Sequence, residues 1–184
     1  MTPAPSLMTV DDYFTKTPET VLPRELAHGL LRAADAPTPR HQSAVLQLLL
    51  ALNAHVTERQ LGRMWVAPLD VVLDEAGALI VQPDLFFISN DRSFIVRDRV
   101  RGAPDLVIEV LSPNPRIGRT EEHVRWFMMN RVRECWLVQR DQRSVSVIQF
   151  AGGLITSRRI FGRRERIESA VLPDLALALD DILD

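Results

Sequence analysis

Residues 102–113 read GAPDLVIEVLSP, and this pattern predicts a buried β-strand that carries an acid near each end. Because side chains alternate along a strand, Asp105, Val107 and Glu109 share one face, and the apolar residues between them share the other. A carboxylate that is buried and ionised without a partner is costly, so each acid needs a cation, a metal ion or hydrogen-bond donors nearby. We therefore expect this strand to contribute both to the hydrophobic core and to a site where its acids are paired.

A further acid interrupts an apolar run upstream of this strand. Residues 79–88 read LIVQPDLFFI, which predicts a long strand that forms a hairpin with residues 70–74. One interpretation is that every such acid pairs with an arginine or caps a strand end. The other is that Asp84 and Glu109 lie on neighbouring strands and point at one place. With the carbonyl of Val110 they would then form an open oxygen site for Mg²⁺ or Mn²⁺, which hydrolyses phosphodiesters by positioning water and neutralising charge.

The clearest helix begins at Pro39 and extends for about 17 residues. Its apolar residues recur at the spacing of a single helix face, namely Val45, Leu48, Leu49, Leu52 and Val56. Next to Arg40, His41 opens this helix. It either faces the predicted site or is a solvated residue of the first turn.

The remaining segments alternate between helical and strand-like periodicity. Thr9, with Asp12 three residues later, predicts a short capped helix, whereas residues 25–32 fit a short helix or a strand. Residues 90–102 are polar and rich in arginine, which predicts a loop or a partly ordered excursion. The other predicted elements are a helix at residues 120–130, strands at residues 134–139, 144–150 and 154–161, and a C-terminal cap at residues 173–184.

This order of elements predicts an α/β fold with a mixed β-sheet flanked by helices. The 184 residues suit a single domain, residues 1–184, in which residues 1–38 are an N-terminal extension packed on the core. Hydrophobic residues make up 46% and charged residues 25%, which excludes a disordered chain.

Charge and cysteine content exclude several classes of protein. A net charge of −2 gives no global positive field that would attract nucleic acid, and it leaves a local basic patch open. The single cysteine, Cys135, excludes a disulfide framework and a four-cysteine zinc site. No apolar run is long enough for a membrane span, and the first residues do not read as a signal peptide, so we expect a cytoplasmic protein without a membrane partner.

Several of these segments together resemble a known family. The Pro83-Asp84 pair on one strand and Glu109 on the next resemble the core of PD-(D/E)XK nucleases, and more specifically the bacterial Uma-type restriction endonuclease family. The similar segments are residues 36–42, 67–74, 81–85, 102–113, 133–138 and 172–175. The resemblance implies a restriction endonuclease-like core, Mg²⁺- or Mn²⁺-dependent hydrolysis of DNA, and a homodimer.

The resemblance also implies a set of catalytic residues, and here the chain departs from the family. In that family the lysine of the motif has moved to the helix after the strand, and an ungapped alignment places His123 at its position. The same alignment places Arg119 where an acid is usual and Phe127 where a tyrosine is usual. Glu25 resembles the glutamate that helps to complete the family's acidic cluster. Of the 22 basic residues only Lys16 is a lysine, and it lies far from this motif in the sequence.

The missing lysine leaves three hypotheses open. In the first, protonated His123 supplies the positive charge, although its reference pKa of ~6.5 requires nearby acids to raise it, or Arg119 or Arg125 supplies it instead. In the second, the site is catalytically impaired and the fold serves as a DNA- or protein-binding module. In the third, the chain is an α/β domain whose acids are all paired with arginine.

Overall fold

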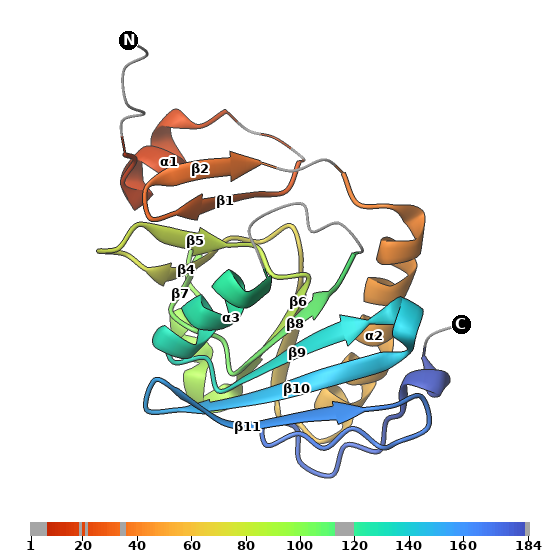
Figure 1. The fold of residues 1–184 in the computed structure, drawn as a ribbon. Coiled ribbons are helices and arrows are strands. Elements are labelled where there is room, and N and C mark those ends of the chain that lie inside the picture. Colours follow the sequence, from red (N-terminus) through yellow and green to blue (C-terminus); the bar gives the residue numbers. More distant parts are fainter. Residues whose placement is uncertain (1–6, 19, 21, 34–35, 113–119, 183–184) are drawn as a thin grey trace.

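A six-stranded sheet forms the centre of the fold, which is seen in a computed structural model that describes residues 7–18, 20, 22–33, 36–112 and 120–182 (Figure 1). Its strands are β3 (Gly62–Val66), β6 (Leu85–Ser89), β8 (Leu106–Val110), β9 (Glu134–Gln139), β10 (Ser144–Ala151) and β11 (Leu154–Phe161). They are ordered β11-β10-β9-β8-β6-β3. β8 and β9 are parallel and the other neighbours are antiparallel, so the predicted mixed sheet is confirmed.

A second sheet has five strands and contains the N-terminal hairpin. Its strands are β1 (Arg24–Ala27), β2 (Leu30–Ala33), β4 (Val71–Asp74), β5 (Leu79–Val81) and β7 (Val100–Arg101), in the order β2-β1-β5-β4-β7. Residues 25–32, for which the periodicity fitted either a helix or a strand, thus form most of a hairpin. β7 lies within residues 90–102, for which we expected a loop or a partly ordered excursion.

The prediction of one long strand over residues 79–88 was wrong. The chain leaves the five-stranded sheet after β5 and enters the six-stranded sheet at β6. Pro83 lies at the break, where its missing N–H and fixed φ suit an interruption better than a central strand. Asp84 consequently lies directly before β6 rather than in the middle of a strand.

Three helices form where the sequence predicts them, and local capping explains two of their starts. Helix α1 (Val10–Lys16) begins with the reciprocal capping box of Thr9 and Asp12. Helix α2 (Pro39–Glu58) begins with Thr38, whose hydroxyl accepts the His41 N–H, and with Pro39 in its first turn. The other helical segments are α3 (Thr120–Met129) and the 3₁₀ turns η1 (Asn90–Ile95), η2 (Arg140–Gln142) and η3 (Leu179–Asp181).

The helices and sheets pack in layers (Figure 1). α2 and the C-terminal residues cover one face of the six-stranded sheet, while α3 and the five-stranded sheet cover the other. The predicted face of α2 is confirmed, with Leu48 and Leu52 at 0% exposure, although Leu49 lies at its rim and is only partly buried. The alternation predicted for β8 also holds, because Ile108 packs on the α2 side and Val107 on the α3 side.

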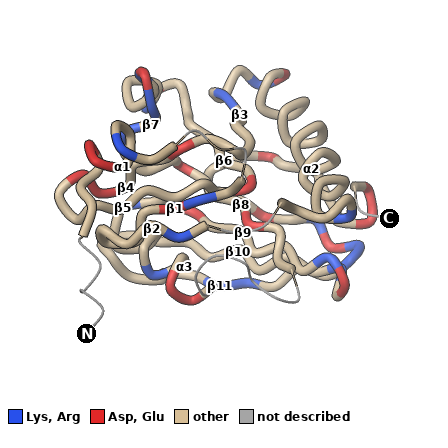
Figure 2. The backbone as a smooth tube through the Cα atoms, turned by 90° about the horizontal axis from the view of Figure 1, so that it is seen from above, with Lys and Arg blue, Asp and Glu red and all other residues tan. Residues whose placement is uncertain are grey.

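Charged residues are distributed over the whole fold. Figure 2 shows basic and acidic residues interspersed along the elements rather than separated onto two faces. Among the helices of the described ranges, none combines the length and apolar character that crossing a bilayer requires.

Candidate active site

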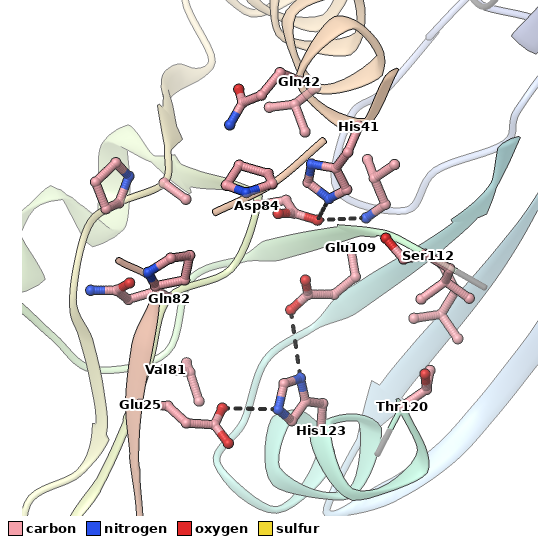
Figure 3. Close-up of a pocket in the computed structure, with 18 of the residues that line it drawn as sticks. Glu25, His41, Gln42, Val81, Gln82, Asp84, Glu109, Ser112, Thr120 and His123 are labelled. Carbon is pink, nitrogen blue, oxygen red and sulfur yellow. Dashed lines mark hydrogen bonds and ion pairs between the residues drawn. The ribbon is translucent and has the colours of Figure 1, made fainter. Parts of the chain in front are cut away.

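A pocket of about 240 Å³ lies where β1, β6, β8 and the N-terminal ends of α2 and α3 meet (Figure 3). The five residues predicted to form the catalytic and metal site line this pocket. They are Glu25, Asp84, Glu109, Val110 and His123. They come from segments far apart in the sequence, so the fold, and no local motif, brings them together.

Strand register places the two acids of the predicted metal site side by side. β6 and β8 are antiparallel with Leu85 opposite Ile108, so the next pair outward is Asp84 and Glu109. The backbone N–H of Val110 donates to Oδ2 of Asp84 at 2.8 Å. Both carboxylates are mostly buried, with side-chain exposures of 20% for Asp84 and 17% for Glu109.

The electrostatics of this pair are unfavourable in the protein alone. Burial and, secondly, the charge of Asp84 raise the pKa of Glu109 from 4.5 to about 8. A carboxyl group with such a pKa carries a proton near neutral pH unless a cation is bound beside it. The pair therefore provides ligand oxygens whose mutual repulsion a bound cation would relieve.

His123 is held between two acids on the α3 side of the pocket. Its Nε2–H donates to Oε2 of Glu25 at 3.0 Å, and its Nδ1 lies 3.9 Å from Oε1 of Glu109 (Figure 3). Burial alone would lower the pKa of His123, but the hydrogen bond to Glu25 and the charges of the neighbouring acids outweigh it and raise the pKa. The ring also packs against Trp126 and Phe127, with centroid distances of 5.0 and 6.1 Å.

Glu25 is buried and binds cationic groups through both oxygens. Oε2 accepts from His123, and Oε1 accepts from the guanidinium of Arg32 at 3.3 Å. Arg32 also forms two hydrogen bonds to the carboxylate of Glu122 on α3, at 2.9 and 3.3 Å. The N-terminal hairpin is thereby linked to α3, and Glu25 orients His123.

The arginines proposed as substitutes for the lysine are not placed by the structure in this role. Arg119 lies outside the described residues, and Arg125 is exposed on α3. Phe127, at the usual tyrosine position, is fully buried. Of the two candidates that the structure describes, His123 and Arg125, His123 is the one that lines the pocket.

His41 is a site residue that sequence reasoning did not separate from a solvated position. It lines the pocket, and its Nε2–H donates to Oδ2 of Asp84 at 3.1 Å. A signal was present in the sequence: His41 precedes Val45, Leu48 and Leu52 at helical spacing, so it continues the buried face of α2. Gln82, which also lines the pocket, gave no such signal.

The donors around the acid pair suit a hard divalent cation. Carboxylate and backbone oxygens are the ligands that Mg²⁺ and Mn²⁺ prefer. Within the part of the chain that the structure describes, no three histidine, cysteine, aspartate or glutamate side chains form a set that could hold a metal ion. The two carboxylates of Asp84 and Glu109 fit an open oxygen site, in which a backbone oxygen, water or substrate would fill the further positions.

Comparison with known proteins identifies the family and the fold. A family model, Uma2, described as "Putative restriction endonuclease", matches residues 11–180. A solved structure, described as a "putative nuclease belonging to DUF820" from Anabaena variabilis, matches with a TM-score of 0.78 at 19% identity and covers 95% of this chain and 97% of that chain. No curated protein matches the chain. The fold is that of restriction endonuclease-like proteins, as predicted. The chain belongs to the Uma2 family.

Proposed function

We propose that this protein is a Mg²⁺- or Mn²⁺-dependent endonuclease that hydrolyses phosphodiester bonds of DNA in this pocket. The observation that carries the proposal is the pairing of Asp84 and Glu109 across β6 and β8, with His123 beside Glu109. The membership of this chain in a restriction endonuclease family supports DNA as the substrate. The family resemblance extends the proposal to a homodimer, and the sequence patterns extend it to a cytoplasmic location.

The residues of the pocket divide the work of hydrolysis between them. Asp84, Glu109 and the backbone oxygen of Val110 would hold the cation, which supplies an activated water and neutralises the charge that develops on the phosphate. The raised pKa of Glu109 supports this assignment, because a cation at the pair would relieve the repulsion between the two acids.

His123 would take the place of the family's lysine. A fixed positive charge beside the reacting phosphate stabilises the transition state. The hydrogen bond from His123 to Glu25 orients the ring and keeps it protonated to higher pH than a free histidine, as the raised pKa indicates. Glu25 thus supports His123, and Arg32 neutralises part of the charge of Glu25.

A second function is favoured by one specific observation. Both ring nitrogens of His123 face acids, Nε2 at 3.0 Å from Glu25 and Nδ1 at 3.9 Å from Glu109. A histidine held in this way has no ring nitrogen directed only at substrate. The alternative proposal is therefore a catalytically impaired member that binds DNA or a protein through the same scaffold.

Nicking of supercoiled plasmid with Mg²⁺ or Mn²⁺ distinguishes the two functions. For an endonuclease, we expect Asp84→Ala to lower the rate by at least about a thousandfold, because a bound metal contributes several kcal/mol of transition-state stabilisation. Asp91→Ala is the matched control, since Asp91 is exposed on η1. Cleavage that survives Asp84→Ala would contradict the assignment of the site. Absence of both cleavage and metal binding in the unmodified protein would favour the binding module.

A further inference from the structure

Oδ2 of Asp84 is held by two donors from different elements. It accepts the Val110 N–H of β8 at 2.8 Å and the Nε2–H of His41 on α2 at 3.1 Å. From the described residues, both hydrogen bonds to this carboxylate end on Oδ2, and Oδ1 receives none. The donors therefore fix the carboxylate plane and leave one oxygen without a protein donor (Figure 3).

His41 is itself held rigidly. Its backbone N–H donates to the Thr38 side chain in the first turn of α2, and the helix continues from there along its buried face. The His41 side chain is only 15% exposed. A donor on a capped, buried helix start loses little side-chain freedom when it binds Asp84, so it can position the carboxylate accurately.

The other ring nitrogen of His41 indicates that the bond to Asp84 serves more than stability. Nδ1 is buried and has no hydrogen-bond partner among the described residues. A buried polar atom without a hydrogen-bond partner destabilises the folded protein. The His41 ring therefore lies where Nε2 can bind Asp84, although Nδ1 then has no partner. Such an arrangement is typical of functional sites.

We propose that His41 is a positioning residue that holds the Asp84 carboxylate in the orientation that binds the divalent cation. The inference rests on the proposed function, and it assigns separate histidines to the two acids. His41 on α2 orients Asp84, whereas His123 on α3 lies beside Glu109. Hydrogen-bond partners that orient a metal ligand typically contribute 10- to 100-fold in metal affinity.

The test measures Mn²⁺ affinity by calorimetry in the full chain and uses variants that differ in reach. His41→Gln keeps an amide N–H at about the distance of Nε2, whereas His41→Asn is too short and His41→Leu has no donor. We expect His41→Leu and His41→Asn to weaken Mn²⁺ binding about 10- to 100-fold and His41→Gln to retain most of the affinity.

His55→Leu is the matched control, because His55 lies on the same helix and its Nε2 contacts the carbonyl of Pro173, away from the pocket. It should leave Mn²⁺ affinity unchanged. Urea unfolding without metal checks that each variant is folded, and the contrast between His41→Gln and His41→Asn separates positioning from a general loss of structure.

Two results would overturn the inference and leave the proposed function intact. One is wild-type affinity in His41→Leu and His41→Asn while Asp84→Asn abolishes binding. The other is a loss in His41→Gln as large as in His41→Leu. If the unmodified protein binds no Mn²⁺ at all, the proposed function fails, and the role of His41 fails with it.

Discussion

Asp105 directly precedes β8 and Glu109 lies near the other end of that strand, and the surroundings of the two acids differ. Asp105 is fully buried, and it accepts the Ser89 N–H at 2.8 Å and the Arg133 guanidinium at 3.2 Å, with Arg92 at 3.6 Å. Glu109 instead faces a second acid, Asp84, and the nearest cationic side chain among the described residues is His123, 3.9 Å away.

This difference shows that the donors around an acid, and not its place in the strand pattern, determine its role. Pairing with arginine, one of the two interpretations of the sequence, describes Asp105. The other, an acid that points with Asp84 into one pocket, describes Glu109. A carboxyl group whose pKa is raised by burial and by a second acid is typical of a functional site.

The largest effect on stability is expected at the Asp105 end of the strand. Asp105→Ala removes two charge-assisted hydrogen bonds and leaves the Ser89 N–H without its acceptor, so we expect a loss of about 3 kcal/mol in the free energy of unfolding. Urea denaturation measures it. Asp98→Ala is the control, because the Asp98 side chain is 72% exposed and its ion pair should contribute under about 0.5 kcal/mol. Equal losses of stability in the two variants would show that the donors around Asp105 do not stabilise the fold.

The Glu109 end should respond in the opposite direction. Because the folded-state pKa of Glu109 is about 8, above its usual 4.5, the folded protein keeps a proton that the unfolded chain releases. Stability without metal should therefore fall as pH rises from about 4.5 to about 8. Glu109→Gln removes this ionisation, so its stability should not show this fall and should exceed that of the unmodified protein at pH 8.

Denaturation at several pH values without metal tests this expectation, with Glu168→Gln as the control. Glu168 is exposed and pairs with Arg159 on β11, away from the pocket. A stability of Glu109→Gln that follows the same pH dependence as the unmodified protein would show that Glu109 is not held protonated by its surroundings.

The smallest effect concerns the charge beside Glu109. The raised pKa of His123 means that the ring is charged at lower pH and loses its charge as pH rises through a value above 6.5. At saturating Mg²⁺, we expect the rate of plasmid cleavage to fall by up to about tenfold for each pH unit above the pKa of His123. His123→Lys should remove this decline, because lysine stays charged to about pH 10. Parallel pH profiles for the two proteins would assign the charge to another group.

Local pattern was sufficient to predict most elements of this fold. The alternation in residues 102–113, the apolar stripe of α2 and the capping pair of Thr9 and Asp12 each depend on neighbours a few residues away. These features led to the mixed sheet, the helix positions and the acids Asp84 and Glu109. The missing lysine and the position of His123 on α3 were also visible, because they follow from residue identity and family resemblance.

Only the tertiary structure decided what surrounds each acid. The bond between His41 and Asp84 spans 43 positions of the chain, that between His123 and Glu25 spans 98, and that between Arg32 and Glu122 spans 90. Periodicity reports which face of an element is buried, but it holds no information on which distant face packs against it. The division into two sheets at Pro83 was also set by strand pairing. The sequence alone therefore determined which residues could do chemistry, and the packing of distant elements decided which of them meet.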